Sequence, residues 1–132
     1  GSKRLLHMHG ELLKLRCENN PEHIFDFNGN ETESTHCPIC SASTRPHIVW
    51  FGEMPLYMQE IERALKECEI FAYIGTSSVV DPAAGFKSIA HSHRAHVTCL
   101  NLEIPNFDPH TDTFIQGNAS EIVPEWVDSL LG

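Results

Sequence analysis

Residues 70–102, IFAYIGTSSVVDPAAGFKSIAHSHRAHVTCLNL, decide the fold that we expect. The apolar run Ile70–Ile74 predicts a buried strand, and His96–Leu102 predicts a second one. Between them, Pro82 suits the first turn of a helix that we expect to run to about His93. Strand, helix, strand is the βαβ unit, in which parallel strands carry helices on their faces.

The same alternation extends in both directions from this unit. On its N-terminal side, His47–Phe51 predicts another short buried strand, and residues 61–68 have apolar side chains at helical spacing. On its C-terminal side, Thr113–Ile115 predicts a short strand and Glu121–Leu131 a closing helix. The sequence therefore predicts an α/β fold with a Rossmann-like parallel sheet and flanking helices.

Composition excludes several classes of function. The chain has 132 residues, enough for one domain, and 18 acidic against 9 basic residues leave a net charge of −9. We therefore expect neither nucleic acid nor a membrane as a partner. Five cysteines, with no basic-then-apolar signal sequence at the start, fit a reducing compartment, so we expect a cytoplasmic protein.

Residues 17–46 differ in composition from the rest of the chain, because they are polar and rich in turn-forming residues. Because they offer little apolar surface, something other than a hydrophobic core must hold them. Cys17 and the turn Cys37-Pro38-Ile39-Cys40 supply three thiols, and a CxxC turn places two thiolates on one side of a tetrahedral cation. We expect a small zinc-ribbon-like lobe.

The fourth ligand of such a site is open. A second CxxC pair would need cysteine at position 20, where the chain has Asn20. His23 and His36 are the candidates to replace it. The alternative is a knuckle that folds without metal.

Two histidines near the N-terminus form the motif His7-Met8-His9-Gly10-Glu11-Leu12. Alternate histidines of a strand share a face, but no third ligand stands at a recognisable spacing to complete a metal site. A histidine before glycine can instead expose its imidazole as a general base.

Polar and small residues follow two of the predicted strands. Gly75-Thr76-Ser77-Ser78 comes after the first and Asn101-Leu102-Glu103 ends the next. Open α/β sheets bind ligands at the carboxyl ends of their strands, although a tight turn and a solvated strand end are the simpler alternative. No GxGxxG is present, so nucleotide binding does not follow from spacing. The apolar stretch His47–Glu53 is either a core strand or an edge that accepts a peptide.

Taken in order, these segments resemble the sirtuins, the NAD-dependent protein deacylases, and most of all their compact bacterial-type members. The resemblance spans essentially the whole chain. It is carried by residues 7–12, Cys17 with Cys37 and Cys40, residues 45–55, Gly75-Thr76-Ser77 with Val80 and Pro82-Ala83-Ala84, Asn101-Leu102-Glu103, and Gly117-Asn118-Ala119-Ser120.

The resemblance implies an activity and a site. In sirtuins the acyl-lysine oxygen displaces nicotinamide from NAD, and the products are free lysine and acyl-ADP-ribose. His9 matches the catalytic base. The residues that match the adenosine half of the NAD site are Gly75, Thr76, Ser77, Asn101, Leu102, Glu103 and Ala119. Those that match the walls of the acyl-lysine cleft are Val49, Trp50, Phe51, Gly52, Glu53 and Val80. The zinc ligands are matched by Cys17, Cys37 and Cys40.

The resemblance also implies a division of the chain and a partner. Residues 1–16 and 47–132 correspond to part of the Rossmann-like domain, and residues 17–46 to the zinc lobe. The glycine-rich first strand-turn-helix and the Gln-Asn-Ile-Asp segment of a whole sirtuin do not occur. We therefore expect the chain to resemble a C-terminal half, to need the missing N-terminal half as its partner, and to turn over little alone. The alternative is an inactive, zinc-supported module that binds a peptide or a partner.

Overall fold

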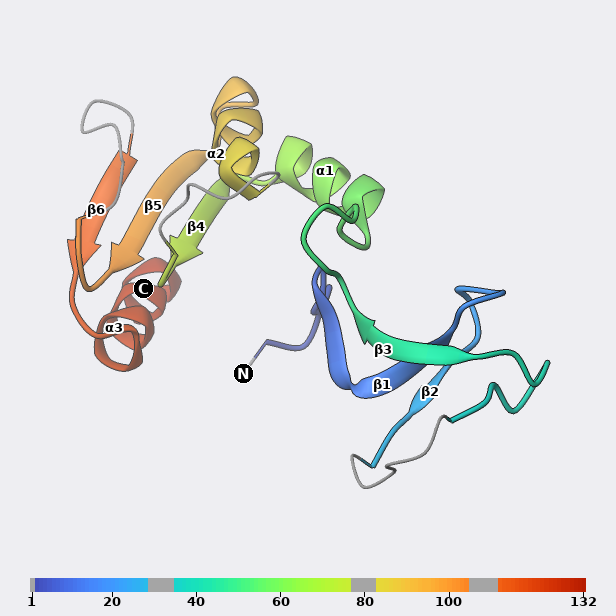
Figure 1. Ribbon diagram of the computed structural model, residues 1–132. Coiled ribbons are helices and arrows are strands. Elements are labelled where there is room, and N and C mark those ends of the chain that lie inside the picture. Colours follow the sequence, from blue (N-terminus) through green and yellow to red (C-terminus); the bar gives the residue numbers. More distant parts are fainter. Residues whose placement is uncertain (1, 29–34, 77–82, 105–111) are drawn as a thin grey trace. The chain divides into compact units, whose positions relative to one another are not determined.

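The first sheet is antiparallel, with β1 (Gly10–Cys17) between β2 (Ile24–Asp26) and β3 (Thr44–Ile48) (Figure 1). A computed structural model describes residues 2–28, 35–76, 83–104 and 112–132. These fall into two compact units, Gly1–Met58 and Gln59–Gly132, and the first sheet belongs to the first unit. The expected division into a part of a Rossmann-like domain, residues 1–16 with 47–132, and a zinc lobe, residues 17–46, stays a prediction.

Gly10 allows β1 and β3 to approach closely. Its φ is +85°, and a Cβ at this position would lie 2.0 Å from the carbonyl oxygen of His47. Only glycine meets both demands, because it lacks a Cβ and adopts positive φ freely. Beside it, the N–H of Val49 donates to the carbonyl of His9 at 2.9 Å, and the N–H of Leu56 donates to that of Met8 at 2.9 Å.

The expectation of a parallel-sheet strand over His47–Phe51 is wrong. β3 ends at Ile48 and pairs antiparallel with β1. After Val49 the chain turns back, with the N–H of Glu53 donating to the carbonyl of Trp50 at 3.0 Å. An apolar run predicts burial but does not specify which sheet a strand joins.

The second unit confirms the βαβ expectation. Its sheet is parallel in the order β4-β5-β6, and each pair is in continuous register (Figure 1). No helix among the described residues is both long and apolar enough to cross a membrane. The elements are α1 (Met58–Glu67), β4 (Ile70–Ile74), α2 (Ala83–Ser92), β5 (His96–Asn101), β6 (Asp112–Gln116) and α3 (Ala119–Leu131).

β5 is the centre of this unit, because it pairs on both sides and is buried on both faces. Val97 and Cys99 point to one face and pack with Leu65 of α1 and Ala90 of α2. Residues 98 and 100 point to the opposite face and are equally buried, and α3 also contacts β5. Helices therefore cover the sheet as the α/β class requires.

A buried carboxylate joins three elements near the start of β6. Asp112, whose side chain is completely buried, lies 3.2 Å from the Tyr73 hydroxyl, 3.0 Å from Nζ of Lys87 and 2.7 Å from Nε2 of His91. Burial, with Cys99 and Asp112 nearby, raises the pKa of Tyr73, so its hydroxyl stays a donor. Partners from β4 and α2 thus compensate a charge that would otherwise be costly to bury.

Candidate functional site

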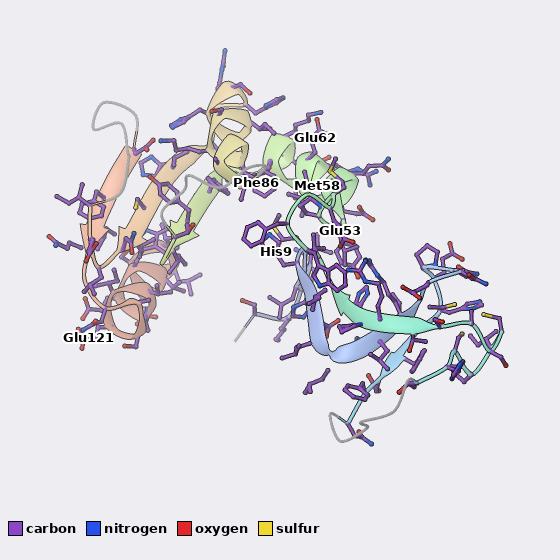
Figure 2. The ribbon with its side chains drawn as sticks, viewed as in Figure 1. His9, Glu53, Met58, Glu62, Phe86 and Glu121 are labelled. Atoms are coloured by element: carbon purple, nitrogen blue, oxygen red, sulfur yellow. The ribbon has the colours of Figure 1, made fainter. Side chains whose placement is uncertain are left out.

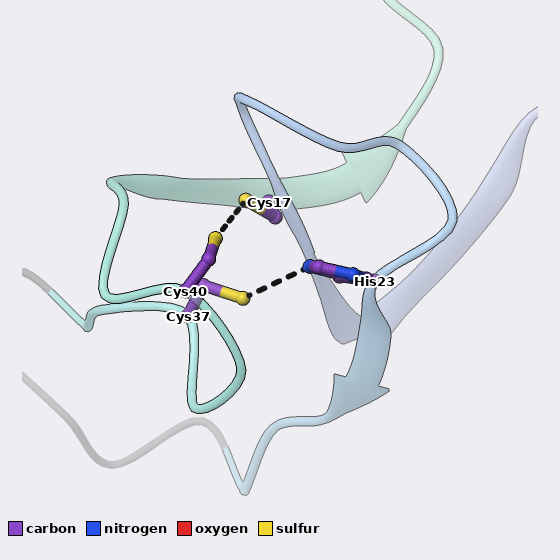
Figure 3. Close-up of side chains that lie close together, drawn as sticks. All are labelled: Cys17, His23, Cys37 and Cys40. Carbon is purple, nitrogen blue, oxygen red and sulfur yellow. Dashed lines mark hydrogen bonds between the residues drawn. The ribbon is translucent and has the colours of Figure 1, made fainter.

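Four metal-ligating side chains converge in the first unit (Figure 3). Cys17 ends β1, His23 precedes β2, and Cys37 and Cys40 stand in the turn before β3. The Cys17 and Cys40 sulfurs are 3.4 Å apart, and Sγ of Cys37 lies 3.5 Å from Nδ1 of His23. All four ligand atoms lie within 4.8 Å of one another.

This geometry fits a tetrahedral zinc ion. Zinc–sulfur bonds near 2.3 Å and zinc–nitrogen bonds near 2.0 Å place neighbouring ligand atoms about 3.5–3.8 Å apart, close to the spacing observed. Burial raises the pKa of Cys37, but hydrogen bonds from the backbone N–H groups of Ile39 and Cys40, and from Cys40 and His23 side chains, outweigh it and bring the pKa to about 6. A thiolate is the form that binds metal.

Of the two candidate fourth ligands, the structure brings His23 into the cluster and leaves His36 outside it. His36 is exposed and forms an isolated β-bridge with Ser43. Asn20, which stands at the position of the absent cysteine, holds His23 instead: its Nδ2 is 3.1 Å from Nε2 of His23, and its Oδ1 accepts from the N–H of Glu22.

His9 stands in the turn immediately before β1, with an exposed side chain (Figure 2). The backbone carbonyl of His9 accepts a hydrogen bond from the N–H of Val49, so the loop after β3 holds the backbone of His9 in place. His7, two residues earlier, instead lies 3.9 Å from Glu11. Among the described residues, neither histidine belongs to a cluster of three or more potential metal ligands.

The segment Val49–Glu53 forms an exposed turn in the same unit. Phe51 at its tip is fully exposed (103%) and Trp50 is half exposed (52%). Glu53 faces inward: it accepts from both nitrogens of the Arg45 fork, 3.0 Å for Nη2, and its pKa falls to about 2, chiefly through Arg45. The turn therefore combines an apolar tip with a charged base.

In the second unit, hydrogen bonds join the residues at the carboxyl ends of β4 and β5. The N–H of Gly75 donates to Leu100 at 3.0 Å, and Asn101 Nδ2 donates to the carbonyl of Thr76 at 3.2 Å. The Oδ1 of Asn101 accepts from the N–H of Leu102 at 2.9 Å. A Cβ on Gly75, whose φ is +63°, would meet no atom of the described residues within 4 Å.

The remaining predicted residues of the strand ends are placed as follows. Glu103 is exposed two residues after β5, and Ala119 is the first residue of α3, after Gly117, whose N–H donates to Asn101 at 3.1 Å. Ser77 and Val80 lie outside the described residues.

The sequence is similar to characterised proteins over almost its full length. The model of the Sir2 family matches residues 1–82. The chain belongs to the Sir2 family. This Sir2 chain is 46% identical over 99% of its length to the NAD-dependent protein deacylase of Yersinia pseudotuberculosis, covering 48% of that protein. It is 47% identical over 99% of its length to the enzyme of the same name from Pasteurella multocida, covering 56% of that protein. The chain thus spans about half the length of the curated relatives it matches.

Solved Sir2 structures agree with the fold. A Sir2 homologue in complex with NAD superposes at a TM-score of 0.83 with 27% identity, over 98% of this chain and 52% of that one. Sir2Af2 bound to a myristoylated histone peptide superposes at 0.75 with 33% identity, over 97% and 57%. The sirtuin family and its α/β fold, both expected from the sequence, are confirmed.

Two sets of residues escaped the sequence analysis. The arginines that hold Glu53 gave no signal beyond the proximity of Arg45 to Glu53 in the chain. The Asp112 cluster gave none, because its members are far apart in sequence and only the fold joins them.

Proposed function

We propose that these residues belong to an NAD-dependent protein-lysine deacylase, which removes acyl groups from lysine and releases nicotinamide and acyl-ADP-ribose. The observation that carries the proposal is 46–47% identity along 99% of the chain to proteins of that name. The matched length includes both units.

His9 is the proposed general base. Its side chain is exposed, and a neutral imidazole can accept a proton from a reacting group. Two backbone hydrogen bonds, from Val49 to His9 and from Leu56 to Met8, keep the turn in place. Val49 also begins the turn 49–53, which we propose contacts substrate. The hydrogen bond from Val49 to His9 therefore supports both the base and this turn.

The strand ends of the second unit are proposed to line the adenosine half of the NAD site. Bound NAD would supply the ribose that receives the acyl group. Gly75 begins the turn after β4 with a positive φ, and Asn101 ties the end of β5 to that turn. The full proposed set is Gly75, Thr76, Ser77, Asn101, Leu102, Glu103 and Ala119.

Acyl-lysine protein or peptide is the proposed substrate, received by Val49, Trp50, Phe51, Gly52, Glu53 and Val80. Support comes from the exposed apolar side chains grouped on this turn, since Trp50, Phe51 and the nearby Met54 are 52%, 103% and 75% exposed, and grouped apolar exposure marks interaction surfaces.

Zinc is the proposed structural metal, held by Cys17, Cys37 and Cys40 with His23 as the fourth ligand. Three thiolates and one imidazole form a closed structural donor set, with no position left for a substrate. The site would hold the polar lobe together where apolar burial is scarce.

Nicotinamide release tests the activity. The chain is incubated with NAD and an acetyl-lysine peptide, alone and together with a polypeptide that supplies the remaining length of the Pasteurella relative. We expect release in the second mixture and its loss in His9→Ala. Full activity of that variant would refute the role of His9.

A peptide-binding module without catalysis is the competing outcome, favoured by the exposed apolar turn. Peptide binding that is independent of NAD, with no nicotinamide released in either mixture, would establish it. In both cases the five cysteines, none of them in a disulfide, support a reducing, cytoplasmic location.

A further inference from the structure

Two arginines face each other across the first sheet. Arg16 of β1 and Arg45 of β3 are direct cross-strand partners. Like charges in this position normally destabilise a sheet. Here both side chains turn toward one carboxylate, because Nη2 of Arg16 lies 3.4 Å and Nη2 of Arg45 lies 3.0 Å from Oε2 of Glu53.

The Oε2 oxygen of Glu53 has three donors. Nη2 of Arg45, Nη2 of Arg16 and the N–H of Trp50, at 3.0 Å, all donate to it. Oε1 accepts from Nη1 of Arg45. Because a carboxylate oxygen has about two acceptor positions, Oε2 is fully occupied, and the carboxylate is held by the arginines and by the backbone of the turn.

Arg45 also holds the other side of the turn. Its guanidinium lies over the Trp50 ring at 3.8 Å from the ring centre, and its Nη2 donates to the carbonyl of Ile48 at 3.3 Å. The side chains of Arg16, Arg45 and Glu53 are only 16%, 17% and 32% exposed. A largely buried ionic group therefore anchors both ends of a turn whose tip, Phe51, stands in water.

Gly52 completes the arrangement. Its φ of +87° allows the chain to reverse between Phe51 and Glu53, so Glu53 returns to the arginines while the ring points away. A turn fixed in this way suits a binding surface that is formed before its ligand arrives, because preorganisation lowers the cost of binding.

We propose that Arg16, Arg45 and Glu53 form an ionic clamp that positions the turn 48–53 for an acyl-lysine peptide. The clamp acts on substrate only through the turn, and Trp50 and Phe51 make the contact. Glu53 is thus a positioning residue. This inference rests on the proposed deacylase function.

The first arm of the test measures the order of the turn in the 132-residue chain. Trp126→Phe leaves Trp50 as the sole tryptophan. Because Trp50 is already 52% exposed, its release can at most roughly double acrylamide quenching. We expect an increase approaching that limit for Glu53→Gln and Arg45→Met, and a smaller one for Arg45→Lys. Glu62→Gln, which removes an exposed carboxylate paired with Lys66, is the matched control and should change nothing.

The second arm measures kinetics in whichever mixture releases nicotinamide. Displacement of the turn should raise KM for the acetyl-lysine peptide about 10- to 100-fold in Glu53→Gln, with KM for NAD unchanged. Arg45→Lys should recover part of the loss. If the clamp had a merely structural role, Glu53→Gln would instead impair kcat and both KM values together, or reduce the folded fraction measured by circular dichroism.

Three results would overturn the proposal. Unchanged quenching would show that the clamp does not order the turn, and unchanged peptide KM with altered quenching would show that the order does not serve substrate. If wild-type protein releases no nicotinamide in either mixture, the deacylase function fails and the substrate role of the clamp fails with it. The quenching arm separates that failure from a failure of the clamp itself.

Discussion

Oδ1 of Asp112 lies 2.7 Å from Nε2 of His91, which links the first residue of β6 to the last turn of α2. The carboxylate side chain has no exposure, whereas that of His91 is 27% exposed. The hydrophobic cluster of the second unit therefore adjoins a polar contact that the fold must satisfy. Substitution of Asp112 therefore measures how much this contact contributes to the free energy of unfolding.

Asp112→Asn should destabilise the second unit. The neutral amide keeps the shape but loses the charge that pairs with Lys87 and His91. Because both partners reach water, we expect a loss of about 1–3 kcal/mol in the free energy of unfolding. Urea titration followed by circular dichroism measures it. Asp128→Asn, at an exposed position of α3, is the control, and equal effects of the two substitutions would contradict the prediction.

Gly10→Ala should be strongly destabilising, and Gly85→Ala should not. At Gly10 the new methyl group meets the His47 carbonyl at 2.0 Å and the positive φ adds about 1–2 kcal/mol. At Gly85, within α2, no atom of the described residues would lie within 4 Å of the new methyl group, so alanine should stabilise the helix by about 0.5–1 kcal/mol. Thermal unfolding of both variants tests the pair. A stable Gly10→Ala protein would mean that β1 and β3 are not held this closely.

Zinc binding should depend on His23 and respond to Asn20. Elemental analysis should find one zinc per chain in the purified protein and a reduced content in His23→Ala. In Asn20→Asp a carboxylate would accept the Nε2 proton of a zinc-bound imidazole, and we expect about 10- to 100-fold tighter binding. Competition with a chromogenic chelator measures the affinity. His36→Ala is the control. Loss of zinc in that variant, with zinc retained in His23→Ala, would show that His36 is the fourth ligand.

Acid should weaken the first unit partly through Glu53. Arg45 lowers the pKa of Glu53 from 4.5 to about 2, so the folded state binds fewer protons than the unfolded state in this range. The stabilisation is present above pH 4.5 and is lost as the pH falls toward 2. The stability difference between wild type and Glu53→Gln should therefore shrink across that window, in urea titrations of metal-free protein. A difference that stays constant with pH would exclude this origin.

Several features could be predicted from sequence because they depend on local pattern. The run Ile70–Ile74, the helix after Pro82 and the strand beginning at His96 all have the expected type, and their ends differ by one residue at most. The CxxC turn indicated metal chemistry for the same reason, since its spacing fixes its geometry.

Other features depend on contacts that no local pattern encodes. His47–Phe51 has the composition of a core strand, but pairing with β1 draws its first residues into an antiparallel sheet and releases the rest as a turn. His23 and His36 are equivalent in sequence as candidate ligands. Only the approach of β2 to Cys17 selects the first of them.

Because β5 is central, amide hydrogen exchange in this strand measures the stability of the second unit. Its residues 97–100 are buried and the strand is bonded on both sides, so its amide hydrogens can exchange with heavy water only when the whole unit opens. The protection factors of the slowest-exchanging amides in β5 would therefore report the opening free energy of that unit alone. For a substitution near the zinc cysteines or the ionic clamp, exchange in β5 would then show whether the loss of stability reaches the second unit or stays in the first.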